Sequence, residues 1–321
     1  MKAFRILAVA AAMTISVAAY ADTWPSRPIK IIAPAPPGGP YDYVARALAE
    51  GLQRALGQPF VVENRAGAGG AIGMEAASKS APDGYTLVVG STGPMSVAPG
   101  MFKKLRYDPD KDFAPVARLV KMPGYLVVHP SLGVDSMKEF LTKVRADPGK
   151  YSYASTGNGF SQHTNMELLK SMANLFVVPI TYRGSGPAMT DLIGGQVQMM
   201  IELGPVVIPH VKAGRLKVLA ASTGTRTEAM PEVPTLNESG VKGFDAYTWF
   251  ALYAPAGTPS DIVQKLYAET ARVLSQPELK SRLASQGAEV ALTTPSELAT
   301  FQAAETKKWT SVVQRAGILP E

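Results

Sequence analysis

The chain contains no cysteine and only three histidines in 321 residues. Without cysteine it has neither a disulfide framework nor a thiol nucleophile, and the histidines at 129, 163 and 210 are too widely separated for a metal-binding motif. The patterns G-x-S-x-G, H-E-x-x-H and G-x-x-x-x-G-K-S/T are also missing from the sequence. We therefore predict no catalytic residue, no metal site and no cofactor, and we expect a protein that is not an enzyme.

Long hydrophobic runs are confined to the beginning of the chain. Apolar residues 6–19 follow Lys2 and Arg5 and precede an A-x-A site at residues 19–21. This layout is typical of a secretory signal peptide, so we expect residues 1–21 to be removed after export; an uncleaved membrane anchor is the alternative. No later segment has 18 consecutive apolar residues, which predicts a mature chain that is soluble.

Charge of one sign is nowhere concentrated. The formal net charge is +6, and no basic run is longer than the pairs Lys103-Lys104 and Lys307-Lys308. Nucleic-acid binding requires a clustered basic patch, so that class of partner is excluded. The roughly 300 residues that follow the signal peptide are enough for two domains, each with its own core.

Strand and helix signals alternate along the chain, which predicts an α/β architecture with largely parallel sheets. Residues 29–33 predict a strand, and residues 40–56 predict a helix with one apolar face. Further strands are expected at 59–64, 85–90, 215–223 and 249–257. Two closing helices are expected after the segments TPSD and TPSE, with Thr258 and Thr294 as their N-caps.

One extended segment, residues 113–130, is unusually long and is broken at Pro123-Gly124. Its length suits a connection that leaves one domain and enters another. We therefore predict a discontinuous first domain made of residues 22–122 and 240–321. Residues 123–239 are predicted to form the inserted second domain.

Four predicted strand-to-helix junctions share a polar, glycine-rich composition: APPGGPYD (35–42), GSTGPMS (90–96), STGNGFSQH (155–163) and YRGSGPA (182–188). In open α/β sheets such junctions lie at the carboxyl ends of strands, where ligands bind. Helix N-termini there present unpaired N–H groups that suit a carboxylate or phosphate. One loop of this kind is usually a plain turn, but four loops in two domains favour a ligand cleft.

Several residues of these loops have two interpretations. Gly38 and Gly39 would let backbone donors approach an anion, whereas Asp42 either contacts the ligand or only complements a helix dipole. His163 either contacts the ligand or caps its helix. Arg183 either pairs with an anion or forms a surface salt bridge.

Outside the loops, Glu202 is either aimed into the cleft or solvated, and Trp249 and Phe250 belong to the core or to the cleft wall. The segment PFVVENRAGAGGAIG, residues 59–73, resembles a dinucleotide fingerprint. The following strand ends without an acidic residue for a ribose hydroxyl, and an export signal does not suit a nicotinamide cofactor. We therefore set aside a dinucleotide oxidoreductase.

Seven segments, in order over nearly the whole mature chain, resemble the periplasmic receptors of tripartite tricarboxylate transporters, the Bug-type solute receptors: PGGPYDYVAR, VVENRAGAGGAIG, PDGYTLVVG, YRGSGPAMTDLIGGQV, KAGRLKVLAAS, PEVPTLNESG and FALYAPAGTP. The resemblance implies a type II periplasmic binding-protein fold. In that fold two α/β domains, joined by hinge strands, close on a ligand in the cleft between them. It implies a small organic acid as ligand, no catalysis, and a periplasmic location.

The same resemblance implies a set of ligand-binding positions: Gly38, Gly39, Asp42, Ser91, Thr92, Thr156, Gly157, Asn158, Ser161, His163, Tyr182, Arg183, Gly184 and Gly186. Many relatives have Asp at the end of the strand that reads QVQMMIEL here, where this chain has Glu202. That position can meet the proximal end of the ligand, so Glu202 joins the predicted site and the identity of the ligand stays open.

The expected partners are a small carboxylate and the membrane permease subunits of a tripartite tricarboxylate transporter. A sensory receptor that signals the same ligand to a membrane kinase is the alternative, and an exported enzyme is a third reading without a supporting residue set. A monomer is expected, because one chain contains both halves of the cleft.

Overall fold

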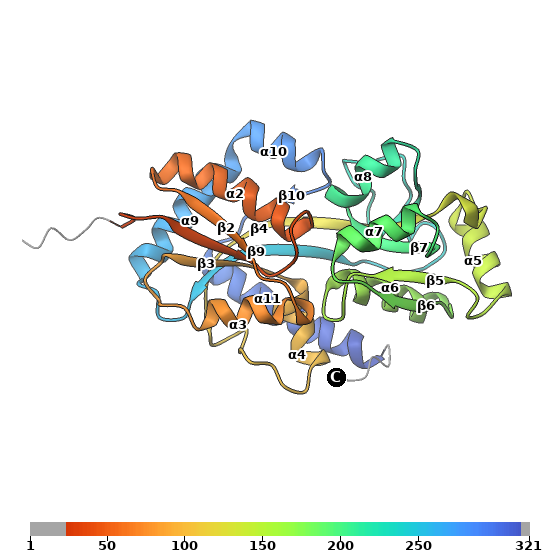
Figure 1. Ribbon diagram of the computed structural model, residues 1–321, viewed down its shortest axis with the longest axis horizontal. Coiled ribbons are helices and arrows are strands. Elements are labelled where there is room, and N and C mark those ends of the chain that lie inside the picture. Colours follow the sequence, from red (N-terminus) through yellow and green to blue (C-terminus); the bar gives the residue numbers. More distant parts are fainter. Residues whose placement is uncertain (1–23, 316–321) are drawn as a thin grey trace, which may run out of the picture.

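The computed structural model describes residues 24–315 and has two lobes side by side along its long axis (Figure 1). The signal peptide expected at residues 1–21 lies outside the described residues. Within the described range, none of the helices has both the length and the apolar character needed to span a bilayer. The long strands β4 (Phe113–Val128) and β9 (Tyr247–Pro255) run from one lobe toward the other.

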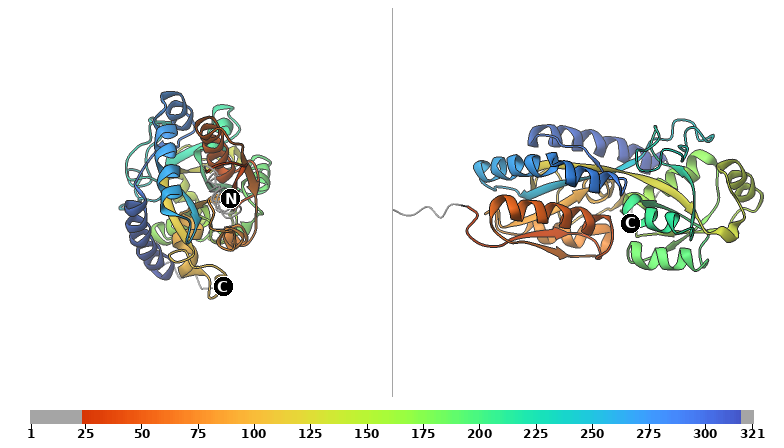
Figure 2. Two further views of the ribbon diagram at one scale, coloured as in Figure 1. Left: turned by 90° about the vertical axis from the view of Figure 1, so that its left-hand side faces the viewer. Right: turned by 90° about the horizontal axis from the view of Figure 1, so that it is seen from above.

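Lobe 1 contains most of the N-terminal third and the C-terminal quarter of the chain. Its strands, together with β9 and the first part of β4, form one continuous sheet with helices on both faces (Figures 1 and 2). Its elements are β1 (Ile29–Ala33), α2 (Pro40–Leu56), β2 (Phe60–Asn64), η1 (Ala68–Gly70), α3 (Ala71–Ser78), β3 (Thr86–Ser91), η2 (Gly93–Val97), α4 (Ala98–Met101), α9 (Ser260–Ser275), α10 (Pro277–Ala284), β10 (Glu289–Val290) and α11 (Pro295–Arg315).

Lobe 2 is the segment between β4 and β9. Here the last part of β4 pairs with β7 and β8, and the sheet continues through β5 to β6 at its edge. Its elements are η3 (Pro130–Leu132), α5 (Met137–Ala146), β5 (Ser152–Ser155), α6 (Ser161–Ala173), β6 (Val178–Thr181), α7 (Ser185–Ile193), β7 (Met199–Leu203), α8 (Gly204–Lys212) and β8 (Lys217–Ala221).

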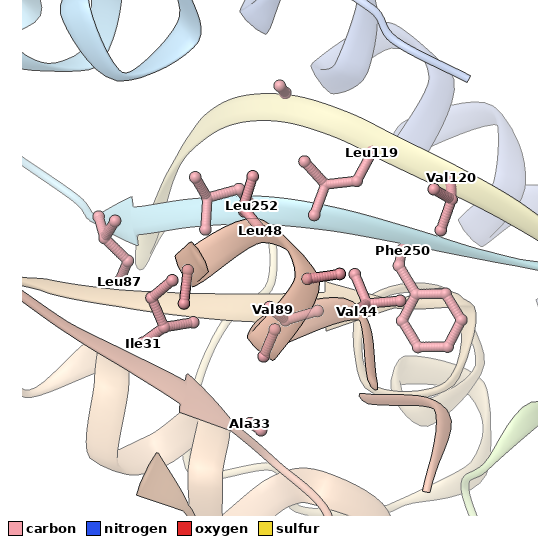
Figure 3. Close-up of a cluster of buried hydrophobic side chains, with 14 of the residues drawn as sticks. Ile31, Ala33, Val44, Leu48, Leu87, Val89, Leu119, Val120, Phe250 and Leu252 are labelled. Carbon is pink, nitrogen blue, oxygen red and sulfur yellow. The ribbon is translucent and has the colours of Figure 1, made fainter. Parts of the chain in front are cut away.

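Helix α2 shows how the local sequence forms lobe 1. Its bounds agree with the prediction: Pro40 follows the N-cap Gly39, and Gly57 ends the helix in a left-handed conformation with φ of 70°. Val44 and Leu48 lie on its buried face and pack on the sheet (Figure 3). The sheet surface that they cover is also apolar on both crossing strands and on β1 and β3, so burial holds helix and sheet together.

The predicted break at Pro123-Gly124 is a change of pairing partner within one uninterrupted strand. Residues 113–123 of β4 pair with β9, whereas residues 124–128 pair with β7 and β8. Gly124 N–H donates to Ser222 Oγ at 2.9 Å. Tyr247 at the start of β9 is the register partner of Pro123, so the chain leaves lobe 1 and returns to it at the same level of the sheet.

The expectation of largely parallel sheets is confirmed only for one group of three strands in each lobe. β1 pairs in parallel with β2 and β3, and β5 pairs in parallel with β6 and β7. The crossing strands β4 and β9 are antiparallel to each other and to their other neighbours. A chain that crosses between lobes and then returns must do so in opposite directions, which local periodicity does not reveal.

Two predictions about the last helices are wrong in detail. Thr258 does not cap α9, because its hydroxyl donates to the carbonyl of Pro255 at 2.7 Å and the helix begins later, at Ser260. The expected pair of closing helices is a set of three, since the short helix α10 lies between α9 and α11. Its eight residues are too few for a clear apolar period.

The cap predicted at Thr294 is confirmed and supplies a first testable prediction. Glu297 N–H donates to Thr294 Oγ1 at 3.3 Å, and Thr294 N–H donates to the Glu297 carboxylate at 2.8 Å. Thr294→Ala removes the acceptor and should lower the free energy of unfolding, measured by urea denaturation, by about 1 kcal/mol. Thr294→Ser is the matched control that keeps the acceptor. Equal losses in both variants would contradict a capping role.

Candidate functional site

A cleft of about 520 Å³ opens where the two lobes meet. Both lobes contribute to its walls through loops that follow strands or precede helices. Lobe 1 contributes Pro36, residues 66–69 and Phe102; lobe 2 contributes residues 156–158, Phe160 and residues 181–184. The loop at 66–69, which resembled a dinucleotide fingerprint, therefore lies at the mouth of this cleft.

A second, much smaller space of about 10 Å³ adjoins the cleft, and Pro36, Thr156, Phe160 and Gly184 line both. It is about the size of one water molecule. The rest of its lining comes from both lobes and consists of Ala35, Gly39, Pro40 and Tyr41 of lobe 1 and Gln162 and Ser185 of lobe 2.

The two lobes touch through backbone at glycine positions around these spaces. A Cβ atom added to Gly69 would lie 2.2 Å from the carbonyl oxygen of Asn158, and one added to Gly93 would lie 2.4 Å from that of Gly159. Real Cβ atoms do not approach so closely, so these glycines permit the lobes to meet. The structure therefore has the lobes in direct contact beside the cleft.

The loop PPGGPYD is held by its own acidic residue. Gly38 N–H donates to Asp42 Oδ2 at 3.1 Å, and Arg46 Nε lies 2.9 Å from Asp42 Oδ1. Burial raises the pKa of Asp42, but the contacts with Arg46 and Gly38 outweigh burial and leave that pKa below its ordinary value. Asp42 lines a groove beside the cleft, not the cleft itself. Of the two predicted glycines, only Gly39 lines the small space.

The predicted residues Ser91 and Thr92 are buried inside lobe 1. The Ser91 hydroxyl is hydrogen-bonded to the Tyr41 hydroxyl, and Thr92 Oγ1 accepts from Trp249 N–H at 3.0 Å. Burial also raises the pKa of Tyr41. These two hydroxyls line neither space; Ser91 instead orients Tyr41, whose ring does line the small one.

The loop that precedes α6 divides between the cleft and the lobe boundary. Thr156, Gly157 and Asn158 line the cleft, and Thr156 Oγ1 is buried without a hydrogen-bond partner among the described residues. Ser161 Oγ is hydrogen-bonded across the boundary to Thr248 Oγ1 on β9 at 2.6 Å.

The interpretation of His163 as a cap is wrong, because Phe160 occupies the N-cap position of α6. His163 is buried in the first turn of that helix and lines neither space.

The loop that precedes α7 presents a cation to the cleft. Arg183 lines the cleft and forms no ion pair with any residue from 24 to 315. Tyr182 donates to Asp191 Oδ2 at 2.8 Å, and burial, followed by this contact, raises its pKa to about 12. Gly184 lines both spaces. Gly186 lines neither, and a Cβ atom added to it would have no other atom within 4 Å.

Glu202 is fully buried, so the solvated interpretation is wrong. Its Oε1 accepts from Gln162 Nε2 at 2.9 Å and from Leu203 N–H at 2.7 Å. Burial raises the pKa of Glu202 above its ordinary value. The carboxyl group lies directly behind Gln162, which lines the small space.

Sequence reasoning missed several residues that line these spaces, among them Tyr41, Phe102, Phe160, Gln162 and Ser185. Gln162 and Ser185 stand within the polar loops that were singled out, so composition was a usable signal for them. Tyr41 also stands in one of these loops, at residues 35–42, whereas Phe102 lies outside all four and carried no such signal. Trp249 and Phe250 belong to the core, and the Phe250 ring meets Tyr41 edge-on with centroids 5.1 Å apart.

The arrangement as a whole favours an anion. Helices α2, α6 and α7 all begin beside the two spaces, and the first turn of each helix has backbone N–H groups without intrahelical acceptors. Arg183 adds a full positive charge. Within residues 24–315, no group of three or more His, Asp or Glu side chains has the arrangement of a metal site.

Comparisons with known proteins agree with this geometry. The family model described as "Tripartite tricarboxylate transporter family receptor" matches residues 44–318. BugT of Bordetella pertussis is 40% identical over 304 residues, which cover 94% of this chain and 93% of BugT.

Two solved structures from Rhodopseudomonas palustris are similar over the whole fold. Rpa4515 with adipate is 33% identical with a TM-score of 0.91, and the match covers 93% of this chain and 100% of that one. MatC (Rpa3494) with bound malate is 35% identical with a TM-score of 0.85, and the match covers 90% and 100%. These likenesses confirm the type II periplasmic binding-protein fold. The chain therefore belongs to the tripartite tricarboxylate transporter receptor family, the Bug-type solute-binding receptors.

Proposed function

We propose that this receptor captures a small organic carboxylate in the periplasm and delivers it to the permease subunits of a tripartite tricarboxylate transporter. The observation that carries the proposal is that three helix N-termini converge on one cleft between two lobes together with Arg183, which has no ion-pair partner among residues 24–315. The carboxylates adipate and malate, bound by the two similar proteins of Rhodopseudomonas palustris, support the same ligand class.

The cleft walls suit a ligand with a charged end and an apolar body. Arg183 and the backbone of residues 156–158 provide the polar part, and Phe102, Phe160 and Tyr182 provide aromatic surface. Apolar walls with a few convergent polar groups are typical of small-molecule sites. The proposed ligands are therefore dicarboxylates, tricarboxylates and aromatic acids. Thr156 Oγ1 is one donor for them, since it has no hydrogen-bond partner within the described part of the chain.

Closure of the lobes would bury the ligand and create the surface that the permease recognises. This proposal includes the two predicted domains, the first made of residues 22–122 and 240–321 and the second of residues 123–239. This division is supported by the change of strand partners at Pro123-Gly124. A monomer is proposed as well, since both walls of the cleft come from one chain.

A thermal-shift panel tests the proposal. Mature protein, refolded to remove any co-purified ligand, is mixed with mono-, di- and tricarboxylates and aromatic acids, and each positive acid is paired with its neutral amide. A true ligand at about 1,000 times its Kd should add roughly 4 kcal/mol to the unfolding free energy and raise Tm by several degrees. The amide should give no shift, because it lacks the anion. If none of the acids raises the Tm of the folded protein, the proposed ligand class is wrong.

A further inference from the structure

Glu202 has an asymmetric set of hydrogen bonds. Its Oε1 accepts two, from Gln162 Nε2 and from Leu203 N–H, whereas its Oε2 is buried without a hydrogen-bond partner among the described residues. The Ser185 hydroxyl lies close enough to the carboxyl group to influence its titration. Gln162 and Ser185 both line the small space between the lobes, so Glu202 touches two residues of the site from behind.

A carboxylate anion does not suit this position. Oε1 is already occupied by two donors, so a proton on Glu202 resides on Oε2. An ionised Glu202 would place a full negative charge in a fully buried position, where the neutral Ser185 hydroxyl is the donor nearest to Oε2 among the described residues. Burial of this charge and its repulsion by an anionic ligand in the adjoining site both cost free energy. A neutral Glu202 instead carries a proton on Oε2, and this O–H is available to donate to an added acceptor.

We propose that Glu202 is a neutral carboxylic acid when the lobes are in contact and that its Oε2–H donates to the Ser185 hydroxyl, which in turn donates to the end of the ligand that reaches the small space. This inference rests on the proposed carboxylate-binding function and narrows its ligand class. The ligand end that faces Glu202 carries a hydrogen-bond acceptor, such as a carboxylate or a hydroxyl group, and no ammonium group. Glu202 is thus a specificity-determining residue.

The elements that pack against β7 also carry ionisable side chains, among them Tyr125 on β4, Tyr153 on β5, His163, Glu167 and Lys170 on α6, Asp191 on α7 and His210 on α8. Tyr125, the register partner of Glu202, is hydrogen-bonded to Thr227, and Asp191 accepts from Tyr182.

Burial is the largest influence on the pKa of Glu202 and raises it, while hydrogen bonds from Leu203, Ser185 and Gln162 lower it by less. No charged side chain within residues 24–315 contributes to that balance.

The test compares wild type with Glu202→Gln and Glu202→Leu by calorimetric titration between pH 6 and pH 9. The probes are adipate, malate and aspartate, the last being malate with an ammonium group in place of the hydroxyl. Glu202→Gln keeps an acceptor for Gln162 and a donor in place of Oε2–H, so it mimics the neutral acid. Glu202→Leu removes both and should abolish binding.

The expected result is that wild-type affinity for adipate or malate falls about tenfold per pH unit once the pH exceeds the pKa of Glu202, because only the protonated fraction is competent to bind. Glu202→Gln should bind with wild-type affinity at low pH and keep that affinity at high pH. Preferential binding of aspartate by wild type that is lost in Glu202→Gln would overturn the inference, since an ionised Glu202 would then be pairing with ammonium.

A ligand-free measurement separates this inference from the proposed function. If Glu202 is protonated in the folded state and ionised in the unfolded state, the folded protein binds more protons. The unfolding free energy then falls as the pH rises from 4.5 toward the folded pKa of Glu202, relative to Glu202→Gln. An identical pH dependence in wild type and Glu202→Gln would overturn the neutral state. Wild type could show this pH dependence of the unfolding free energy and yet bind none of the carboxylates. That outcome would reject the proposed ligand class but still establish that Glu202 is protonated.

Discussion

Gly93→Ala is expected to weaken carboxylate binding about five- to 150-fold. The added methyl group would lie 2.4 Å from the carbonyl oxygen of Gly159 and 3.2 Å from the Cα of Phe160, both in lobe 2, when the lobes are in contact. Overpacking of this kind costs about 1–3 kcal/mol, which corresponds to that range in Kd. Gly93 does not have a positive φ, so alanine adds no backbone strain of its own.

The measurement is Kd for the best carboxylate of the thermal-shift panel, together with the unfolding free energy of the ligand-free protein. Gly186→Ala is the matched control, because its Cβ has no atom within 4 Å and Gly186 also has no positive φ. If Gly93→Ala acts by hindering closure of the lobes, it weakens binding but changes the unfolding free energy of the ligand-free protein only a little. An equal loss of stability without ligand would show that the contact of Gly93 with Gly159 is permanent packing.

Glu305→Ala is expected to lower the unfolding free energy by about 2–6 kcal/mol. Glu305 Oε2 accepts from the indole N–H of Trp249 at 3.2 Å and from that of Trp309 at 3.1 Å, and both rings are fully buried. Removal of the acceptor leaves two buried donors unpaired, and each costs about 1–3 kcal/mol. The contact also joins β9 to α11, so its loss weakens the attachment of the last helix to the sheet.

Urea unfolding monitored by tryptophan fluorescence measures this change, since two of the three tryptophans in the chain contact Glu305 directly. Glu305→Gln is the matched control, because it keeps one amide oxygen at a similar position and should lose much less stability. If both variants lost the same amount, negative charge and not the acceptor would be the stabilising feature. Lys308, whose Nζ lies 3.6 Å from Oε1, would then be the partner to examine.

Local pattern was sufficient for most of the secondary structure. Helix α2 was predicted with the bounds it has, and the strands β1, β2, β3, β8 and β9 lie within or close to their predicted ranges. Apolar periodicity, proline at the first helical position and glycine at the end act between near neighbours, so they can be read without knowledge of the rest of the fold. The orientation of β4 against β9 depends on contacts between distant segments, and helix α10 is too short to show a clear apolar period.

Within the site, local pattern identified the loops but not the direction of their side chains. Ser91 and Thr92 match the expected chemistry, yet their hydroxyls bond to Tyr41 and Trp249 N–H inside lobe 1. Gln162 and Ser185 face the other lobe and line the small space. The composition of a loop indicates which hydrogen-bond donors it contains. The packing of the loop against its own sheet determines which of these donors remain available for a ligand.

The sequence by itself determined the order of strands and helices, the polar glycine-rich loops and the family of this protein, because all three depend on residues close together in the chain. Only the tertiary structure decided that Asp42 holds its own loop through Gly38 and Arg46, and that Glu202 lies buried behind the site. Both outcomes depend on desolvation and on partners brought together by folding, since the state of a carboxyl group is determined by the dielectric environment and the donors around it.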